Sequence, residues 1–324
     1  MTHFVKSQTG VSRIWQVENS MKRFTALIIF FLLVLQIGNA ESALEWEEGA
    51  TFLYGMSIYQ ANGESLSKPA VDMASLNDGL LIRIENGMPY FDRGILLFVL
   101  DGKIQSFSID DEKVFFSEFT IGANTVIEVK VRFDELYMSD DEAEKYLHVV
   151  QIGLLDHVPS DEYDYNDVYA NVCSIPIVPQ KDKAIIEAFD DELELIPVSS
   201  RVYEDILENG GIICFSEKMD EKHIYIRNCI EEGTLPYQLQ VTAVNEPQEL
   251  SILLLADGKP WQPEKPLCSG YALSGHALQK TYTFSDLQPG DHQLCAIMIP
   301  MNESIALPIA TPKMLLCISD EENE

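Results

Sequence analysis

Most hydrophobic positions fall into short runs separated by turn residues, a pattern that is typical of β-strands. Residues 126–132 read Val-Ile-Glu-Val-Lys-Val-Arg, in which apolar and charged side chains alternate from Ile127 on, as an antiparallel strand with one buried face requires. Residues 52–58 show the same period of two with aromatic and apolar side chains. Capping signals predict two short helices, at about 140–147 and 200–209. The pattern therefore predicts an all-β fold.

One strand pair occurs twice along the chain. Residues 95–103 read Ile-Leu-Leu-Phe-Val-Leu-Asp-Gly-Lys, and residues 251–259 read Ser-Ile-Leu-Leu-Leu-Ala-Asp-Gly-Lys. In each copy a continuous apolar run ends at an Asp-Gly pair, which is a strong hairpin signal. A strand-like run precedes each copy, at 80–85 and 237–244. We predict an internal duplication that builds two tandem antiparallel β-sandwich domains.

A short segment of the second copy carries a family resemblance. Leu287-Gln-Pro-Gly-Asp-His292-Gln-Leu294 resembles the L-x-P-G-x-Y corner of fibronectin type III and other immunoglobulin-like domains. The last position of that corner sends a hydroxyl back across a sheet corner, and His292 holds this position here, so the hydroxyl contact is lost. The resemblance implies immunoglobulin-like sandwiches and no particular activity.

The chain is predicted to begin with a leader, residues 1–40, that is not part of the fold. Within it, residues 21–40 have a charged start, an apolar run and small residues at the end, which is the pattern of a signal peptide. The apolar run is shorter than the roughly 20 residues needed to span a bilayer. A segment with prolines and charges near residue 180 indicates a linker, so we place two domains at 41–180 and 181–324.

The chain is strongly acidic, with 52 Asp and Glu residues against 22 Lys and Arg and a net charge of −30. Such a surface repels phosphate backbones, which argues against nucleic acid as a partner. Together with the leader, it is consistent with a secreted protein, extracellular or periplasmic. We expect an unknown protein or glycan partner and no transmembrane span after signal cleavage.

Six cysteines are too few for a scaffold held together by disulfides, but export permits bridges. Cys214 and Cys229 flank a predicted hairpin, and Cys295 and Cys317 lie on two late strands, so both pairs are candidate disulfides. The cysteines do not indicate a metal site, because no two have C-x-x-C spacing.

An acidic segment between two apolar strands is the strongest candidate site. Its oxygen-bearing side chains include Asp156, Glu162, Asp164, Asn166 and Asp167. Calcium takes about six to eight oxygen ligands, and a loop of this kind can supply them. Residues 164–168 also resemble the D-Y-N-D-V loop of secreted bacterial calcium-binding β-sandwich domains, and the resemblance implies bound Ca²⁺. The alternative is an acidic loop without a metal, since acidic residues are abundant throughout this chain.

No set of residues indicates a catalytic centre. His292, Cys295 and Met298 are of types found in copper sites, but strand geometry places residue 295 on the face opposite the other two. We therefore predict an exported, non-enzymatic protein of adhesion, recognition or surface structure, with calcium stabilising its first domain. The alternative is a carbohydrate-binding accessory module or hydrolase that uses the acids of loop 156–167 and neighbouring tyrosines.

Overall fold

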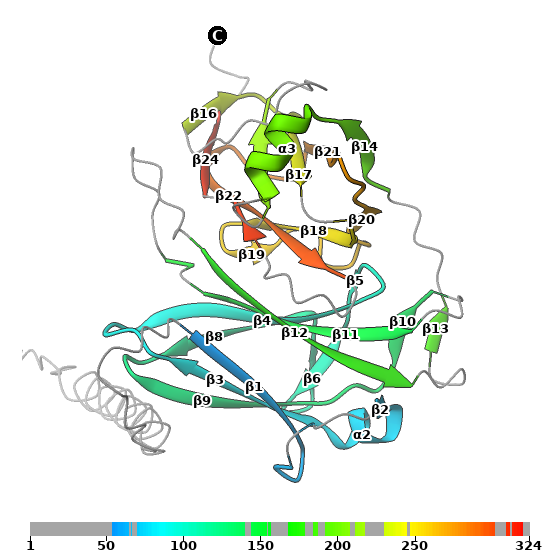
Figure 1. Ribbon diagram of the computed structural model, residues 1–324. Coiled ribbons are helices and arrows are strands. Elements are labelled where there is room, and N and C mark those ends of the chain that lie inside the picture. Colours follow the sequence, from blue (N-terminus) through cyan, green and yellow to red (C-terminus); the bar gives the residue numbers. More distant parts are fainter. Residues whose placement is uncertain are drawn as a thin grey trace, which may run out of the picture. The chain divides into compact units, whose positions relative to one another are not determined.

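Figure 1 shows the protein as a computed structural model. The residues it describes are 54–64, 66, 70–139, 144–153, 155–156, 168–178, 184–186, 192–207, 211–217, 230–244, 247–301, 309–311 and 313–319. The predicted leader lies outside the described residues.

The first half of the chain contributes two main sheets. One has the strand order β1-β3-β9, and the other has the order β2-β12-β11-β4-β5, with β8 also paired to β4. Their strands are β1 (Tyr54–Gln60), β3 (Leu80–Asn86), β9 (Thr125–Val131), β2 (Val71–Asp72), β12 (Tyr169–Val178), β11 (Lys145–Gly153), β4 (Asp92–Leu100), β5 (Lys103–Ile104) and β8 (Phe116–Ile121). Smaller elements are α2 (Met73–Asp78), β6 (Phe107–Ile109), β7 (Glu112–Val114), β10 (Leu136–Met138) and β13 (Ala184–Ile186).

The second half contributes two further sheets. One has the order β14-β21-β17-β15, and the other has the order β16-β24-β22-β18-β19, with β20 paired to β18 and β23 to β22. The elements are β14 (Glu194–Pro197), α3 (Ser200–Leu207), β15 (Ile212–Ser216), β16 (Ile230–Gly233), β17 (Tyr237–Val244), β18 (Glu249–Ala256), β19 (Lys259–Pro260), β20 (Cys268–Tyr271), β21 (His276–Phe284), β22 (Gly290–Pro300), β23 (Ile309–Ala310) and β24 (Met314–Ile318).

The two halves share one strand topology. The sheet β2-β12-β11-β4-β5 corresponds strand by strand to β16-β24-β22-β18-β19, and β1-β3-β9 corresponds to β15-β17-β21. The registers also agree, because His148 lies opposite Val99 and Cys295 lies opposite Leu255, each two residues before an Asp-Gly turn. This correspondence is what a duplicated module would produce; the duplication itself stays a prediction.

Three main hydrophobic clusters hold the fold together. One lies within each half, and the third draws residues from both halves, among them Ile95 and Leu97 of β4 with Leu253 and Leu255 of β18. Alternate residues of β4, such as Phe98, belong instead to the core of the first half. Both faces of β4 and β18 are therefore buried, which explains why their apolar runs do not alternate.

The predominantly β architecture confirms the all-β expectation, and α3 confirms the helix predicted at 200–209. The helix predicted at 140–147 is wrong where the chain is described, because β11 begins at Lys145. Strand pairing with β4 and β12 overrides the local capping signal there. The sheets are also not wholly antiparallel, since β2, β13 and β16 each join a neighbour in parallel.

Strand pairing continues past the predicted domain boundary at 180, because β13 pairs with β10 of the first half. Residues 51–324 form one compact unit, within which each sheet takes its strands from one half only. The division into 41–180 and 181–324 stays a prediction. Within the described residues, no helix is both long and apolar enough to cross a membrane.

Candidate ligand-binding cleft

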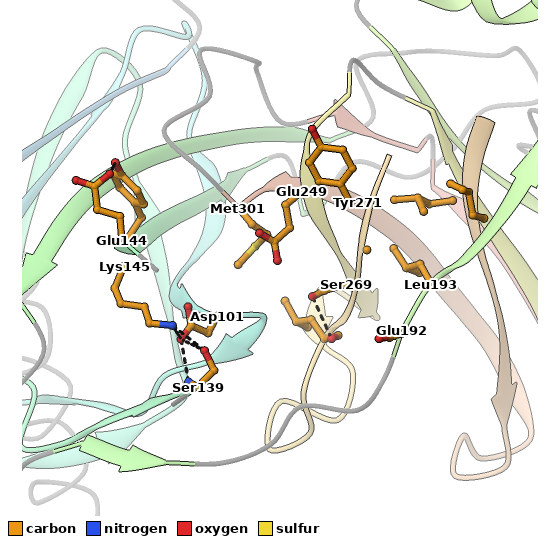
Figure 2. Close-up of a pocket in the computed structure, with 15 residues that line it drawn as sticks. Asp101, Ser139, Glu144, Lys145, Glu192, Leu193, Glu249, Ser269, Tyr271 and Met301 are labelled. Carbon is orange, nitrogen blue, oxygen red and sulfur yellow. Dashed lines mark hydrogen bonds and ion pairs between the residues drawn. The ribbon is translucent and has the colours of Figure 1, made fainter. Parts of the chain in front are cut away.

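A cavity of about 500 Å³ is lined by residues from both halves, and we call it the acidic cleft. Figure 2 shows Asp101, Ser139 and Lys145 meeting on one side of it, with Leu193 and Tyr271 on the other. Its lining residues are Asp101, Ser139, Glu144, Lys145, Tyr146, Glu192, Leu193, Leu195, Glu249, Leu267, Ser269, Gly270, Tyr271, Leu278 and Met301. Four of these residues are acidic and one is basic, so the lining is negatively charged.

The first Asp-Gly turn supplies the most buried carboxylate of the acidic cleft, Asp101. Asp101 and Gly102 have positive φ angles of 48° and 71°, as the turn between β4 and β5 requires. The Asp101 carboxylate oxygen Oδ2 accepts hydrogen bonds from the Ser139 backbone N–H (2.9 Å) and the Ser139 hydroxyl (2.8 Å). It also lies 2.8 Å from Nζ of Lys145, whose side chain is only 3% exposed. The turn aspartate therefore neutralises the one basic group of the lining.

The same turn contacts the second half of the chain. The Gly102 carbonyl accepts a 2.6 Å hydrogen bond from the Leu267 N–H. A Cβ atom at residue 102 would lie 2.6 Å from the Ser269 hydroxyl oxygen, which is closer than real Cβ contacts allow. Glycine is thus required here for two reasons: the positive φ angle, and the short distance between Ser269 and the position that a Cβ atom would occupy.

The remaining carboxylates of the acidic cleft are more exposed than Asp101. Glu144, Glu192 and Glu249 are exposed side chains. Beside them Tyr271 is 56% exposed and Leu195 is 37% exposed, so both side chains are accessible to a ligand. An aromatic ring and an apolar side chain next to carboxylates suit a ligand with a cationic group on an apolar stem.

The predicted calcium loop is described at one residue only. Asp156 accepts hydrogen bonds at Oδ1 from Nε of Arg93 (2.8 Å), and the second guanidinium nitrogen is also 2.8 Å away. Arg93 also reaches Glu118 at 3.3 Å, so Asp156 belongs to a surface ion-pair network. Glu162, Asp164, Asn166 and Asp167 lie outside the described residues. Among all the residues that the structure describes, no three His, Cys, Asp or Glu side chains cluster as metal ligands would. The calcium site stays a prediction.

His292 replaces the lost hydroxyl contact with one of its own. Its Nε2 lies 2.7 Å from the Gln288 carbonyl oxygen, and its Nδ1 lies 2.8 Å from Oδ2 of Asp257, the aspartate of the second Asp-Gly turn. Burial alone lowers the pKa of His292, but the hydrogen bonds to Asp257 and Gln288 outweigh it and raise the pKa above its usual value. Because both ring nitrogens face oxygen acceptors, the charged imidazolium fits this position.

His148 is the opposite case, a histidine held neutral. It is fully buried, with Nδ1 2.9 Å from the Ser174 hydroxyl and Nε2 3.0 Å from the Met301 carbonyl of the second half. Burial lowers its pKa to about 4, although the Met301 carbonyl and the charge of Asp101 act in the other direction. The neutral ring can donate from Nε2 to Met301 and accept from Ser174 at Nδ1.

One predicted disulfide is wrong. Cys317 carries a free thiol, so it is not bridged to Cys295. The two residues lie on paired strands but not opposite each other, because Cys317 is opposite Asp291. The partner predicted for Cys214, Cys229, lies outside the described residues.

The acidic cleft itself was not predicted. The repeated Asp-Gly signal does point to Asp101, but Lys145 is brought to it by the register of β11 against β4. Glu192, Glu249 and Tyr271 come from three separate segments, and no spacing in the sequence connects them.

Comparison with known proteins adds little. No protein-family model and no curated protein matches the chain. Similar solved structures include red sea bream transglutaminase (9% identity, 84% of this chain and 32% of that chain, TM-score 0.22). They also include the Salmonella enterica SafA pilin with its SafB chaperone (12% identity, 81% and 97% coverage, TM-score 0.22). A third is the CsuC–CsuE chaperone–tip adhesion subunit complex of Acinetobacter baumannii (10% identity, 82% and 100% coverage, TM-score 0.19).

The chain spans about a third of the length of that transglutaminase. All three TM-scores are below 0.5, so these likenesses carry no argument about function.

Proposed function

We propose that this protein is an exported, non-enzymatic recognition or surface-structural protein built from two immunoglobulin-like sandwiches of common origin. The observation that carries the proposal is the acidic cleft, whose lining comes from both halves of the chain. A site assembled in this way depends on the two halves being held together, and the shared hydrophobic cluster of β4 and β18 supplies that connection.

The ligand of the acidic cleft, on this proposal, is a cationic segment of a partner protein. Lys145 is paired with Asp101, whereas Glu144, Glu192 and Glu249 are exposed in the lining and within reach of an incoming group; Glu144 also accepts a hydrogen bond from the Tyr146 hydroxyl (2.9 Å). An arginine or lysine side chain would place its charge among these carboxylates and its methylene stem beside Tyr271. The net charge of −30 would also steer a basic partner toward the protein.

Calorimetric titration with short peptides tests this proposal. We expect an acetylated Leu-Arg-Leu-Arg peptide to bind, and the same peptide with glutamine for arginine not to bind. The double variant Glu192→Gln/Glu249→Gln should weaken binding at least about tenfold, since a charge-assisted contact contributes roughly 1.5–3 kcal/mol. Glu264→Gln is the matched control, because Glu264 is exposed and does not line the acidic cleft. Equal weakening by the control variant would reveal only diffuse charge attraction and would contradict the proposal.

A carbohydrate ligand is the second candidate, and the exposed ring of Tyr271 favours it. Sugar rings stack on exposed aromatic side chains while nearby carboxylates accept hydrogen bonds from their hydroxyl groups. A glycan array separates the candidates: binding to one sugar class that is lost in Tyr271→Ala supports the carbohydrate. A carbohydrate site built from loop 156–167 would use residues that, apart from Asp156, lie outside the described part of the chain.

We also propose that calcium stabilises the first half through the loop that begins at Asp156. The acidic composition of that loop supports a calcium site. The ion pair between Arg93 and Asp156 argues against Asp156 as one of the ligands. A rise in melting temperature with millimolar Ca²⁺, absent with Mg²⁺ and absent in Asp164→Ala, would support the metal. Identical melting curves with and without Ca²⁺ would exclude it.

A further inference from the structure

Within the described residues, no strand pairs with the outer edge of β9 over residues 125–131, whereas part of the same edge is paired in the second half. β9 ends its sheet in the order β1-β3-β9, and Figure 1 shows it at the border of that sheet. The corresponding strand of the second half is β21, and there β14 pairs with the outer edge over residues 276–279. Among the described residues, the first half therefore lacks one strand that the second half possesses.

The backbone of β9 shows which groups are available for pairing. Arg132, just after β9, exchanges both of its backbone hydrogen bonds with Ser108 of β6, on the side away from β3. In an extended strand, alternate residues direct their N–H and C=O groups to the same side. Val126, Glu128 and Lys130 share the parity of Arg132 and hence direct these groups outward. These residues lie opposite β3 on one side, and no described strand pairs with them on the outward side.

The side chains near this edge also lack cover. Ile127 and Val129 of β9 pack against the first core but are only partly buried. On β21, by contrast, Ala277 and Leu278 are 0% and 1% exposed. There Ile196 of β14 packs with Ala277 in a separate cluster on the opposite face of β21, whereas Leu193, just before β14, is 7% exposed and joins Leu278 in the second core. The added strand of the second half thus completes a core margin that the first half leaves open.

We propose that the edge of β9 over residues 125–130 accepts an extended segment of a partner protein, which pairs antiparallel as β14 does with β21. The segment would carry apolar side chains at alternate positions, because one side must cover Ile127 and Val129 while the other faces water. It would lie beside β6, which already covers the far end of this edge at Arg132. This site is separate from the acidic cleft and does not depend on it.

Amide hydrogen exchange on the unmodified full chain is the first test. The amides of Val126, Glu128 and Lys130 should exchange on the order of a hundredfold faster than those of Ile127 and Val129, which bond to β3. Equal protection of both sets would mean that the edge is already covered, and the proposal would fail.

Peptide addition is the second test. The probe is an acetylated peptide with the sequence of residues 192–198, in which glutamine replaces both glutamates and threonine replaces proline, so that it carries no positive charge for the acidic cleft. We expect saturable binding, with exchange at Val126, Glu128 and Lys130 slowed at least about tenfold. No binding at millimolar peptide, or binding without protection of these amides, overturns the proposal.

A proline variant locates the peptide on the edge. Glu128→Pro removes one outward N–H and leaves the pairing with β3 intact, since proline is tolerated on edge strands. It should abolish peptide binding, while the matched Glu128→Ala should retain it. If Glu128→Pro does not fold, Lys130→Pro serves the same purpose. The double variant Glu192→Gln/Glu249→Gln should bind this peptide normally, so that failure of the acidic cleft and failure of the edge are distinguished.

Discussion

The two Asp-Gly turns have the same local sequence and conformation but lie in different surroundings. Asp101 is 18% exposed at its side chain and pairs with Lys145, whereas Asp257 is 51% exposed and pairs with His292. Lys145 and His292 occupy equivalent positions, because the registers of β11 on β4 and of β22 on β18 place each one opposite the glycine of its turn. Local sequence thus determines the turn, and the surrounding fold determines how much its ion pair contributes to stability.

The same contrast holds three residues further along the two strands. His148 and Cys295 are equivalent in register, and both are buried within the described residues. His148 brings a titratable hydrogen bond to the other half of the chain, through the Met301 carbonyl, whereas Cys295 contacts Ala296 and Thr311 of its own half. The first half should therefore carry most of the electrostatic sensitivity of the fold.

The largest effect is expected for removal of the buried cation. Lys145→Met leaves the Asp101 carboxylate partly buried without its counter-charge, and we expect a loss of about 3–5 kcal/mol in the free energy of unfolding. His292→Gln at the equivalent position should cost roughly 1 kcal/mol or less, because Asp257 remains hydrated. Urea unfolding of both variants measures the difference. In the double variant Lys145→Met/Asp101→Asn much of the loss should be recovered, and equal losses at residues 145 and 292 would refute the comparison.

A somewhat smaller effect is expected from acid at His148. The folded-state pKa of about 4 lies below the unfolded value of about 6.5, so the unfolded chain binds the proton first as the pH falls. The stabilising contribution is complete above pH 6.5 and is lost between pH 6.5 and 4, amounting to roughly 3 kcal/mol. We expect His148→Gln, which cannot titrate, to lose less stability than the unmodified protein over this range. Parallel pH curves for the two proteins would contradict this assignment.

The smallest effect concerns the two turn glycines. Gly102→Ala and Gly258→Ala both place alanine at a positive φ angle, but the nearest atom to the new Cβ is 2.6 Å away in the first case and 3.6 Å in the second. We expect Gly102→Ala to be the more destabilising of the two by about 1–2 kcal/mol in thermal unfolding. Adding Ser269→Ala should remove most of this difference, because the clash is with the Ser269 hydroxyl.

Hydrophobic patterning was enough to predict the β architecture, but not how its sheets are combined. The alternation at 126–132 correctly predicted β9, a strand with one exposed face. The uninterrupted runs in β4 and β18 contained further information, since strands buried on both faces do not alternate. They indicate a second packing surface, which the structure supplies as the cluster shared by both halves.

The candidate site was less accessible to sequence reasoning. The pairing of Asp101 with Lys145 depends on strand register, which no spacing along the chain reveals. The helix predicted at 140–147 shows the reverse problem, because a local capping signal there points to helix while β11 takes its hydrogen bonds from two neighbouring strands. At the position where the L-x-P-G-x-Y corner has tyrosine, His292 contacts the backbone through a ring nitrogen instead of a hydroxyl group.

The hydrophobic cluster shared by the two halves has an evolutionary consequence. Removing either half would expose the apolar sheet face of the other half to water and favour aggregation. Once the two halves shared this cluster, we expect recombination to transfer them together, because a single half would carry an uncovered apolar sheet face.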